Sequence, residues 1–151
     1  MAVPTIIDDE ALGRLTWDGK SGEWQFTIVL PDGRTIPGSI MPEDSRRPLQ
    51  DQGFPEMRER ILRVRDNEPS IRGDVASRMF DWWLEAYYDE EIDEVDTLEG
   101  FRDAISLCGI SVYEDRKVRL IYQDGGLVGG HGISVRLSET GEIDMGPDIF
   151  G

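Results

Sequence analysis

The sequence predicts an α+β fold, in which N-terminal antiparallel strands, about three central helices and C-terminal antiparallel strands build one mixed or antiparallel sheet packed on the helices. Two observations predict it. Apolar and polar residues alternate in the first third of the chain and in its last forty residues, whereas apolar residues recur at helical spacing between them. The length of 151 residues fits one acidic domain, 1–151.

The first third predicts a hairpin or a three-stranded meander. Residues 12–17 form a short candidate strand, and residues 23–30 alternate clearly, because Trp24, Phe26 and Ile28 share one face. The segment 31–33, Pro-Asp-Gly, is a turn, after which the chain returns through residues 36–40. Proline has no N–H to donate, so Pro37 predicts an edge strand or a bulge.

The middle of the chain predicts helices. One begins near Pro55 and ends at Asn67 and Pro69, because proline interrupts the helical hydrogen bonds. A second spans residues 74–88 and is apolar on most sides, which indicates a central place in the core. A third, short helix is expected between the N-cap Thr97 and the C-terminal cap Gly109; its apolar residues are Leu98, Phe101, Ile105 and Cys108.

The last forty residues predict two strand pairs. Residues 110–113 pair with 118–122, and residues 132–137 pair with the strand that contains Ile143 and Met145.

The charge balance is unusual. Thirty-one acidic and sixteen basic residues give a net charge of −15. Nucleic acids are held mainly by lysine and arginine, so binding to nucleic acid is not expected, nor is binding to an anionic membrane. Such a field attracts a basic protein and raises its association rate. The start of the chain shows no positive region followed by an apolar one, and no segment is apolar enough to span a membrane, which predicts a cytoplasmic protein.

The densest acidic run supplies the candidate partner-binding residues Asp89, Glu90, Glu91, Asp93, Glu94 and Asp96. The run does not match a calcium loop, because Glu94 stands where that loop needs glycine and Gly100 stands where it needs glutamate. A solvated linker and a docking surface for a basic protein remain the two interpretations, and the second is the functional one. No metal or other cofactor is expected. Trp83 and Tyr88 are the candidate aromatic anchors of such a surface.

His131, the sole histidine, is a candidate pocket residue. It follows a glycine-rich segment, 125–130, but a strand and not a helix comes after it, so the geometry of a phosphate-binding loop is absent. Cys108 is the sole cysteine and is expected at the C-terminal end of a helix, where the dipole raises the pKa of a thiol. A catalytic Cys108–His131 pair is therefore disfavoured, and no catalytic residue is assigned.

Two short stretches together resemble a known family. The first is Leu-Gly-Arg-Leu-Thr-Trp at 12–17, followed by Trp24 and Pro-Asp-Gly; the second is Gly-His-Gly-Ile-Ser-Val at 130–135, followed by Gly141 and the closing Gly-Pro-Asp-Ile-Phe-Gly. They resemble an uncharacterised bacterial domain-of-unknown-function family with a C-terminal Gly-His-x-Ile/Val motif. Some of its members resemble immunity proteins encoded beside polymorphic toxins. The resemblance implies stoichiometric binding of a toxin without catalytic turnover.

Three hypotheses follow. The leading one is a non-enzymatic binding protein, in its narrower form an immunity-type inhibitor of a basic partner. The alternatives are a small enzyme that uses carboxylates near His131, and a homodimer whose apolar helix forms the interface.

Overall fold

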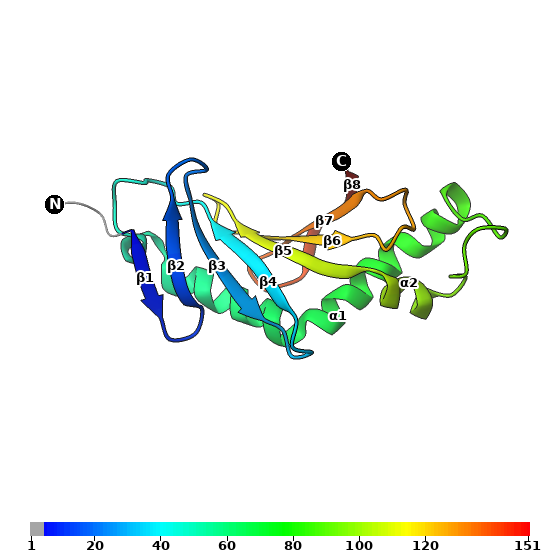
Figure 1. Cartoon of the computed structure of the whole chain (residues 1–151), viewed down its shortest axis with the longest axis horizontal. Coiled ribbons are helices and arrows are strands. Elements are labelled where there is room, and N and C mark those ends of the chain that lie inside the picture. The colour runs from blue at the N-terminus through cyan, green and yellow to red at the C-terminus, as the bar shows by residue number, and fades with distance from the viewer. Residues whose placement is uncertain (1–4) are drawn as a thin grey trace.

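The structure, a computed structural model, describes residues 5–151 and consists of one eight-stranded sheet with two α-helices (Figure 1). The strands follow one another across the sheet in chain order, as two four-stranded antiparallel meanders joined by a parallel β4–β5 pair. The predicted α+β class and mixed sheet are confirmed. The strands are β1 Ile6–Asp9, β2 Gly13–Asp18, β3 Glu23–Val29, β4 Thr35–Ile40, β5 Ser106–Val112, β6 Val118–Gln123, β7 Gly132–Leu137 and β8 Ile143–Phe150.

The N-terminal meander keeps the predicted alternation. Trp24, Phe26 and Ile28 of β3 are buried on the face that packs on the long helix, and Gln25 and Thr27 point to the uncovered face. β1 was not predicted from the sequence; it pairs with β2 along the outer edge of the sheet.

Both expectations for Pro37 are wrong, because β4 lies inside the sheet between β3 and β5 and the register around Pro37 shows no bulge. The pairing of β4 with β5 involves three residues of each strand, Gly38–Ile40 and Ile110–Val112. Pro37 lies just before this paired stretch, so β5 requires no N–H from it. The contact between the two meanders within the sheet is therefore short.

The long helix α1, Phe54–Ala86, replaces the two helices predicted for this region, so two α-helices stand where about three were expected. Pro69 lies inside it, although proline in a helix interior costs about 3 kcal/mol. The apolar stripe continues in register through the proline, since Val64 and Ile71 are both buried. Burial of this stripe against the sheet outweighs the cost of one lost hydrogen bond.

The length of α1 decides the shape of the molecule. Its 33 residues extend about 50 Å, whereas eight strands span roughly 34 Å. The helix runs across the strands, and its C-terminal end projects past the sheet together with the loop that follows (Figure 1). No helix in the part of the chain described here is both long enough and apolar enough to cross a membrane.

The short helix α2, Leu98–Ala104, begins as predicted, because the Thr97 hydroxyl accepts a hydrogen bond from the Gly100 N–H at 3.0 Å. It ends earlier than predicted, and Cys108 lies on β5 instead of on a helix. A β-bulge between Leu107 and Gly109 shifts the register there. The bulge interrupts the alternation of period two, so residues 106–109 of the strand resemble the end of a helix in the sequence, whereas the predicted pairing of residues 110–112 with β6 is confirmed.

One member of the helical stripe is charged. Glu68 is 3% exposed, and its Oε1 has no hydrogen-bond partner among the described residues. Arg72, one turn later, lies 3.6 Å away. Burial raises the pKa of Glu68, and the attraction of Arg72 offsets this effect only in part. The hydroxyl of Tyr122 is also buried without a partner, and burial raises its pKa too.

We expect Glu68→Gln to gain stability over the wild type as the pH rises. The pKa of Glu68 is higher in the folded than in the unfolded chain, so the wild type loses stability between the unfolded value and the folded one. Each pH unit between the folded and unfolded pKa of Glu68 corresponds to about 1.4 kcal/mol in the free energy of unfolding. Urea denaturation of both proteins from pH 4 to pH 8 measures this. A constant stability difference over that range would contradict the burial of an ionisable Glu68.

We expect Gly38→Ala to destabilise the protein by about 1–3 kcal/mol. A Cβ atom at Gly38 would overlap the ring of Phe26, the residue paired with Gly38 on the neighbouring strand β3. Thermal and urea denaturation measure the loss, and Gly109→Ala is the control, because its Cβ would meet ordinary contacts only. Combined with Phe26→Leu, Gly38→Ala should lower the free energy of unfolding by less than it does alone. If the effects of the two substitutions on this free energy simply add, the clash is refuted.

Candidate partner-binding surface

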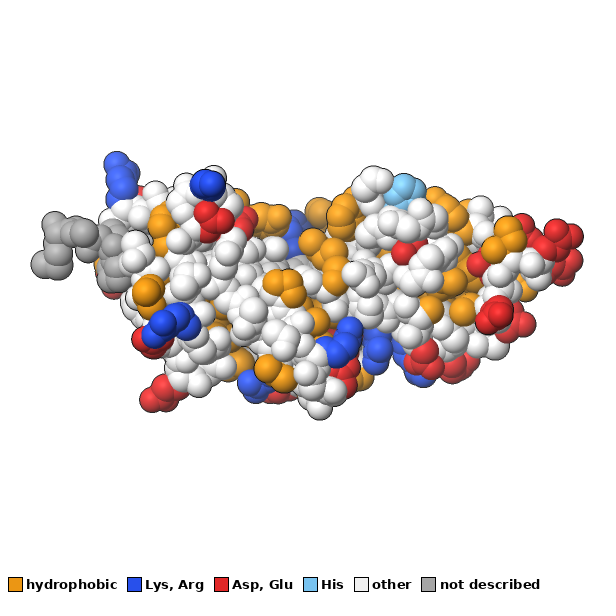
Figure 2. Space-filling view, in the orientation of Figure 1, with side chains coloured by type: hydrophobic (Ala, Val, Ile, Leu, Met, Phe, Trp, Pro, Cys, Tyr) orange, Lys and Arg blue, Asp and Glu red, His pale blue; other side chains and the backbone are white. Residues whose placement is uncertain are grey.

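The predicted acidic run forms the loop between α1 and α2, at the end of the molecule where α1 projects. Figure 2 shows acidic side chains gathered at that end. The loop is held by its own acidic residues: the Asp93 carboxylate accepts the N–H of Asp89 at 2.9 Å, and the Asp89 carboxylate accepts the N–H of Glu91 at 3.0 Å. Two carboxylates thus fix the backbone, while Glu90 and Glu94 remain exposed to solvent.

The acidic charge of the chain is concentrated around this loop. We call residues 81–103 the acidic tip: they contain ten acidic residues and one basic residue, a net charge of −9 out of the −15 of the whole chain. Within residues 5–151, no lysine or arginine forms an ion pair with an acidic residue at positions 81–99. The tip therefore carries negative charge that the protein itself does not neutralise.

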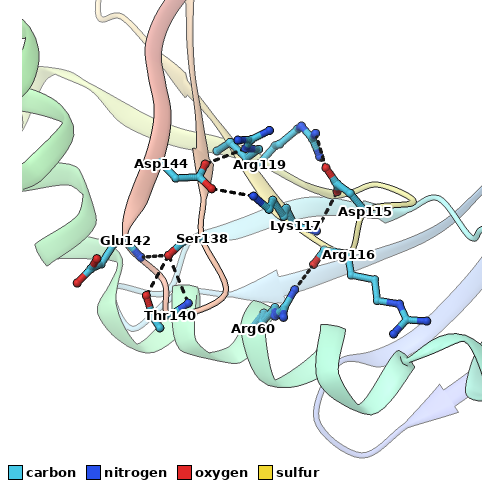
Figure 3. Close-up of polar contacts among 10 residues, drawn as sticks. Arg60, Asp115, Arg116, Lys117, Arg119, Ser138, Thr140, Glu142 and Asp144 are labelled. Atoms are coloured by element: carbon cyan, nitrogen blue, oxygen red, sulfur yellow. Dashed lines mark hydrogen bonds and ion pairs between the residues drawn. The ribbon is translucent and has the colours of Figure 1, made fainter.

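Acidic residues on the C-terminal meander are placed differently. Asp144 lies between Lys117, at 2.9 Å, and Arg136, at 2.7 Å (Figure 3). Asp115 pairs with Arg119 at 2.9 Å. The hydrogen bond from Arg136, then that from Lys117, lowers the pKa of Asp144. These carboxylates have cationic partners within the fold, whereas among the described residues Asp103, beside Arg102 at 3.2 Å, is the one acidic residue of the tip that has such a partner.

The structure corrects the expectation for Trp83. Its side chain is 0% exposed, and its indole N–H donates to the carbonyl of Leu127 at 2.7 Å, so a partner cannot reach it. Tyr88 is half-buried and lies edge-on to Trp83, with ring centroids 5.5 Å apart. Val75, Met79 and Trp83 follow one another at intervals of four and are all buried. This spacing in the sequence could have assigned Trp83 to the buried side of the helix and Trp82 to the exposed side.

At the tip, the exposed aromatic residues are the sequence neighbours of the predicted Trp83 and Tyr88. Trp82 is 44% exposed and Tyr87 is 41% exposed, and their ring centroids lie 5.3 Å apart. Ile92, in the acidic loop, is 78% exposed. Large exposed apolar side chains beside unpaired carboxylates are typical of a protein-binding surface.

A crevice of about 340 Å³ lies beside Trp82. Arg78, Met79 and Trp82 of α1 line one wall, and residues 147–149 of β8 line the other: Pro147, Asp148 and Ile149. Met79 is buried, and Ile149 packs on the core from its half-buried position. The crevice thus has largely apolar walls and opens at the surface of α1.

His131 lines a shallow hollow of about 340 Å³ at the start of β7, together with Cys108 and the glycine-rich segment. Its Nδ1 lies 2.8 Å from the carbonyl of Gly151. The Cys108 thiol donates to the carbonyl of Ile121 at 3.3 Å, and burial raises its pKa. A thiol with a raised pKa is a poor nucleophile, which disfavours a catalytic role for Cys108.

Asp124 is the carboxylate of this hollow, and its oxygens are occupied. They accept the N–H groups of Gly126, Val128 and Gly130 at 2.8–3.0 Å. Burial by itself raises the pKa of Asp124, but these three donors lower it below the ordinary value. The group holds the glycine-rich turn in place. Among the described residues no set of three histidine, cysteine or acidic side chains is arranged to hold a metal ion.

The uncovered face of the sheet carries a second exposed surface. A hollow of about 540 Å³ lies over β2–β5, lined by small polar residues such as Thr27, Ser39 and Ser111, with Arg14 as its one charged residue. Figure 2 shows a mainly uncharged surface over this part of the sheet. The opposite face buries the apolar stripe of α1, so the helix surface that the homodimer hypothesis requires is not free.

Comparisons of the chain with protein-family models, with curated proteins and with solved structures give no match.

We expect Asp124→Ala to lower the free energy of unfolding by about 2–4 kcal/mol, because three backbone N–H groups lose a charged acceptor. The pKa of Asp124 is lower in the folded chain, so its contribution is complete above the unfolded value. It is lost as the pH falls through the folded value. Urea denaturation between pH 2 and pH 7 measures this. Equal pH dependence of variant and wild type would contradict the assignment.

Proposed function

We propose that this protein is a binding protein without catalytic turnover, which engages a basic protein partner through the acidic tip. The observation that carries the proposal is the concentration of unpaired negative charge: the tip holds −9 of the net charge of −15. Complementary charge raises the association rate and selects against acidic competitors.

Two further features support the proposal. The exposed Trp82, Tyr87 and Ile92 add apolar contact area within or beside the charged region. The hydrogen bonds of Asp89 and Asp93 order the loop before any partner arrives, which lowers the entropic cost of binding.

The narrower form of the proposal is an immunity-type inhibitor that binds a toxin one to one. It derives from the resemblance of the two short stretches to the bacterial family named above. The enzyme alternative has less support, because the Asp124 carboxylate accepts three backbone N–H groups and burial raises the pKa of the Cys108 thiol.

We expect neutralisation of the tip to abolish capture of a basic protein from lysate of the source organism. The test variant combines Asp89→Asn, Glu91→Gln, Asp93→Asn and Glu94→Gln. The control combines Glu10→Gln, Asp51→Asn, Glu59→Gln and Glu142→Gln, which removes the same charge at exposed sites elsewhere. Wild type and control should retain the partner at about 50 mM salt and release it at about 500 mM, because salt screens the attraction.

Mass spectrometry identifies the captured protein, and titration of the purified pair measures the affinity. The proposal fails if no basic protein is captured at low salt, or if both variants lose the partner equally. Equal loss would show a dependence on total charge instead of on the tip.

A further inference from the structure

The crevice beside Trp82 shows what kind of partner segment the tip accepts. It is largely apolar and lies on the helix that leads directly into the acidic loop. We propose that this crevice receives an apolar side chain of a basic amphipathic helix of the partner, while the lysine and arginine residues of that helix meet the surrounding carboxylates. This inference rests on the proposed function and specifies its partner segment.

The shape and chemistry of the crevice favour an apolar side chain. Met79, Pro147 and Ile149 offer no charged group, and the exposed indole of Trp82 forms an edge. A volume of about 340 Å³ is enough for one or two large side chains, in the lower range of ligand pockets. An apolar crevice beside an exposed tryptophan is the geometry in which interface hot spots occur.

The charges around the crevice favour a basic segment. Glu85 lies three residues after Trp82, on the same side of the helix, and the exposed Asp148 is part of the crevice lining. Arg78, the one cation of its lining, lies a turn before Trp82, away from the acidic loop. Negative charge therefore increases along α1 toward its end, where the helix dipole adds to it and the last turn contains no basic residue.

An amphipathic helix satisfies both conditions. Its apolar residues lie on one face at intervals of three and four, and lysine and arginine can occupy the remaining positions. A helix laid along α1 would place one apolar side chain in the crevice and its basic residues against the carboxylates of the tip. This is the helix-in-groove mode of recognition, with the charges reversed between the partners.

The probes are three synthetic helical peptides of about 16 residues. The first has lysines and an apolar face of leucine and tryptophan; the second has serine in place of the apolar residues at the same net charge; the third has glutamate in place of lysine. Fluorescence anisotropy measures their binding to the full chain at about 50 and 300 mM salt. We expect the first peptide to bind at least tenfold more tightly than the second and to retain binding at the higher salt, and the third not to bind.

Variants locate the site. We expect Trp82→Ala to remove the tenfold preference for the apolar face, and Ile149→Thr, on the opposite wall, to reduce it. Val29→Ala, at an exposed apolar residue of the sheet, is the matched control and should change nothing. Circular dichroism establishes that each variant is folded. If Trp82→Ala does not fold, Ile149→Thr still tests the crevice.

The outcomes separate this inference from the proposed function. Equal affinity for the first two peptides, or a preference that survives both crevice variants, overturns the crevice inference alone. If a basic partner is captured from lysate through the tip and neither basic peptide binds, the proposed function stands and the amphipathic segment is refuted. If the tip-neutralised protein binds the first peptide as well as the wild type does, the role of the tip in binding is refuted too.

Discussion

Packing of one apolar helical stripe against one sheet is the interaction on which the rest of this structure depends. The two meanders contact each other within the sheet through three residues each of β4 and β5. The helix α1 crosses the sheet and buries residues along its whole length, from Phe54 to Trp83. At roughly 25 cal/mol for each Å² of apolar surface, this burial exceeds the cost of Pro69 many times over. The helix thus joins the two halves of the sheet.

The same helix separates two kinds of surface. Because α1 is longer than the sheet is wide, its last turns and the following loop extend beyond the meanders and carry most of the net charge. Several acidic residues of the sheet have cationic partners, as Asp144 has in Lys117 and Arg136. Charge that is paired contributes little to a long-range field, whereas the unpaired tip gives the molecule a negative end. In the proposed function, this field would direct a basic protein toward that end.

The sequence predicted the regular elements and missed those that depend on tertiary context. Alternation in β3 and in β7, and the cap at Thr97, could be recognised because each is a local pattern. Pro69 suggested a break, since local propensity cannot register the energy gained when a helix packs across a whole sheet. The pairing of residues 110–112 with β6 was predicted, but the bulge at Cys108 concealed the first half of β5 because it breaks the period of two. For the site, the acidic residues could be predicted from composition. The choice between Trp82 and Trp83 required knowledge of which side of α1 meets the sheet.

Residues far away in the sequence hold the tip in its place. The Asp124 carboxylate holds the turn that contains Leu127, and the carbonyl of Leu127 accepts the indole N–H of Trp83. Trp83 lies on the last buried turn of α1, and its ring packs against Phe101 of α2 at 5.2 Å between centroids. Both helices that flank the acidic loop are therefore fixed to the C-terminal meander through buried contacts. A loop anchored at both ends and hydrogen-bonded by its own carboxylates has fewer accessible conformations than an open loop, which would reduce the entropic cost of the binding proposed above.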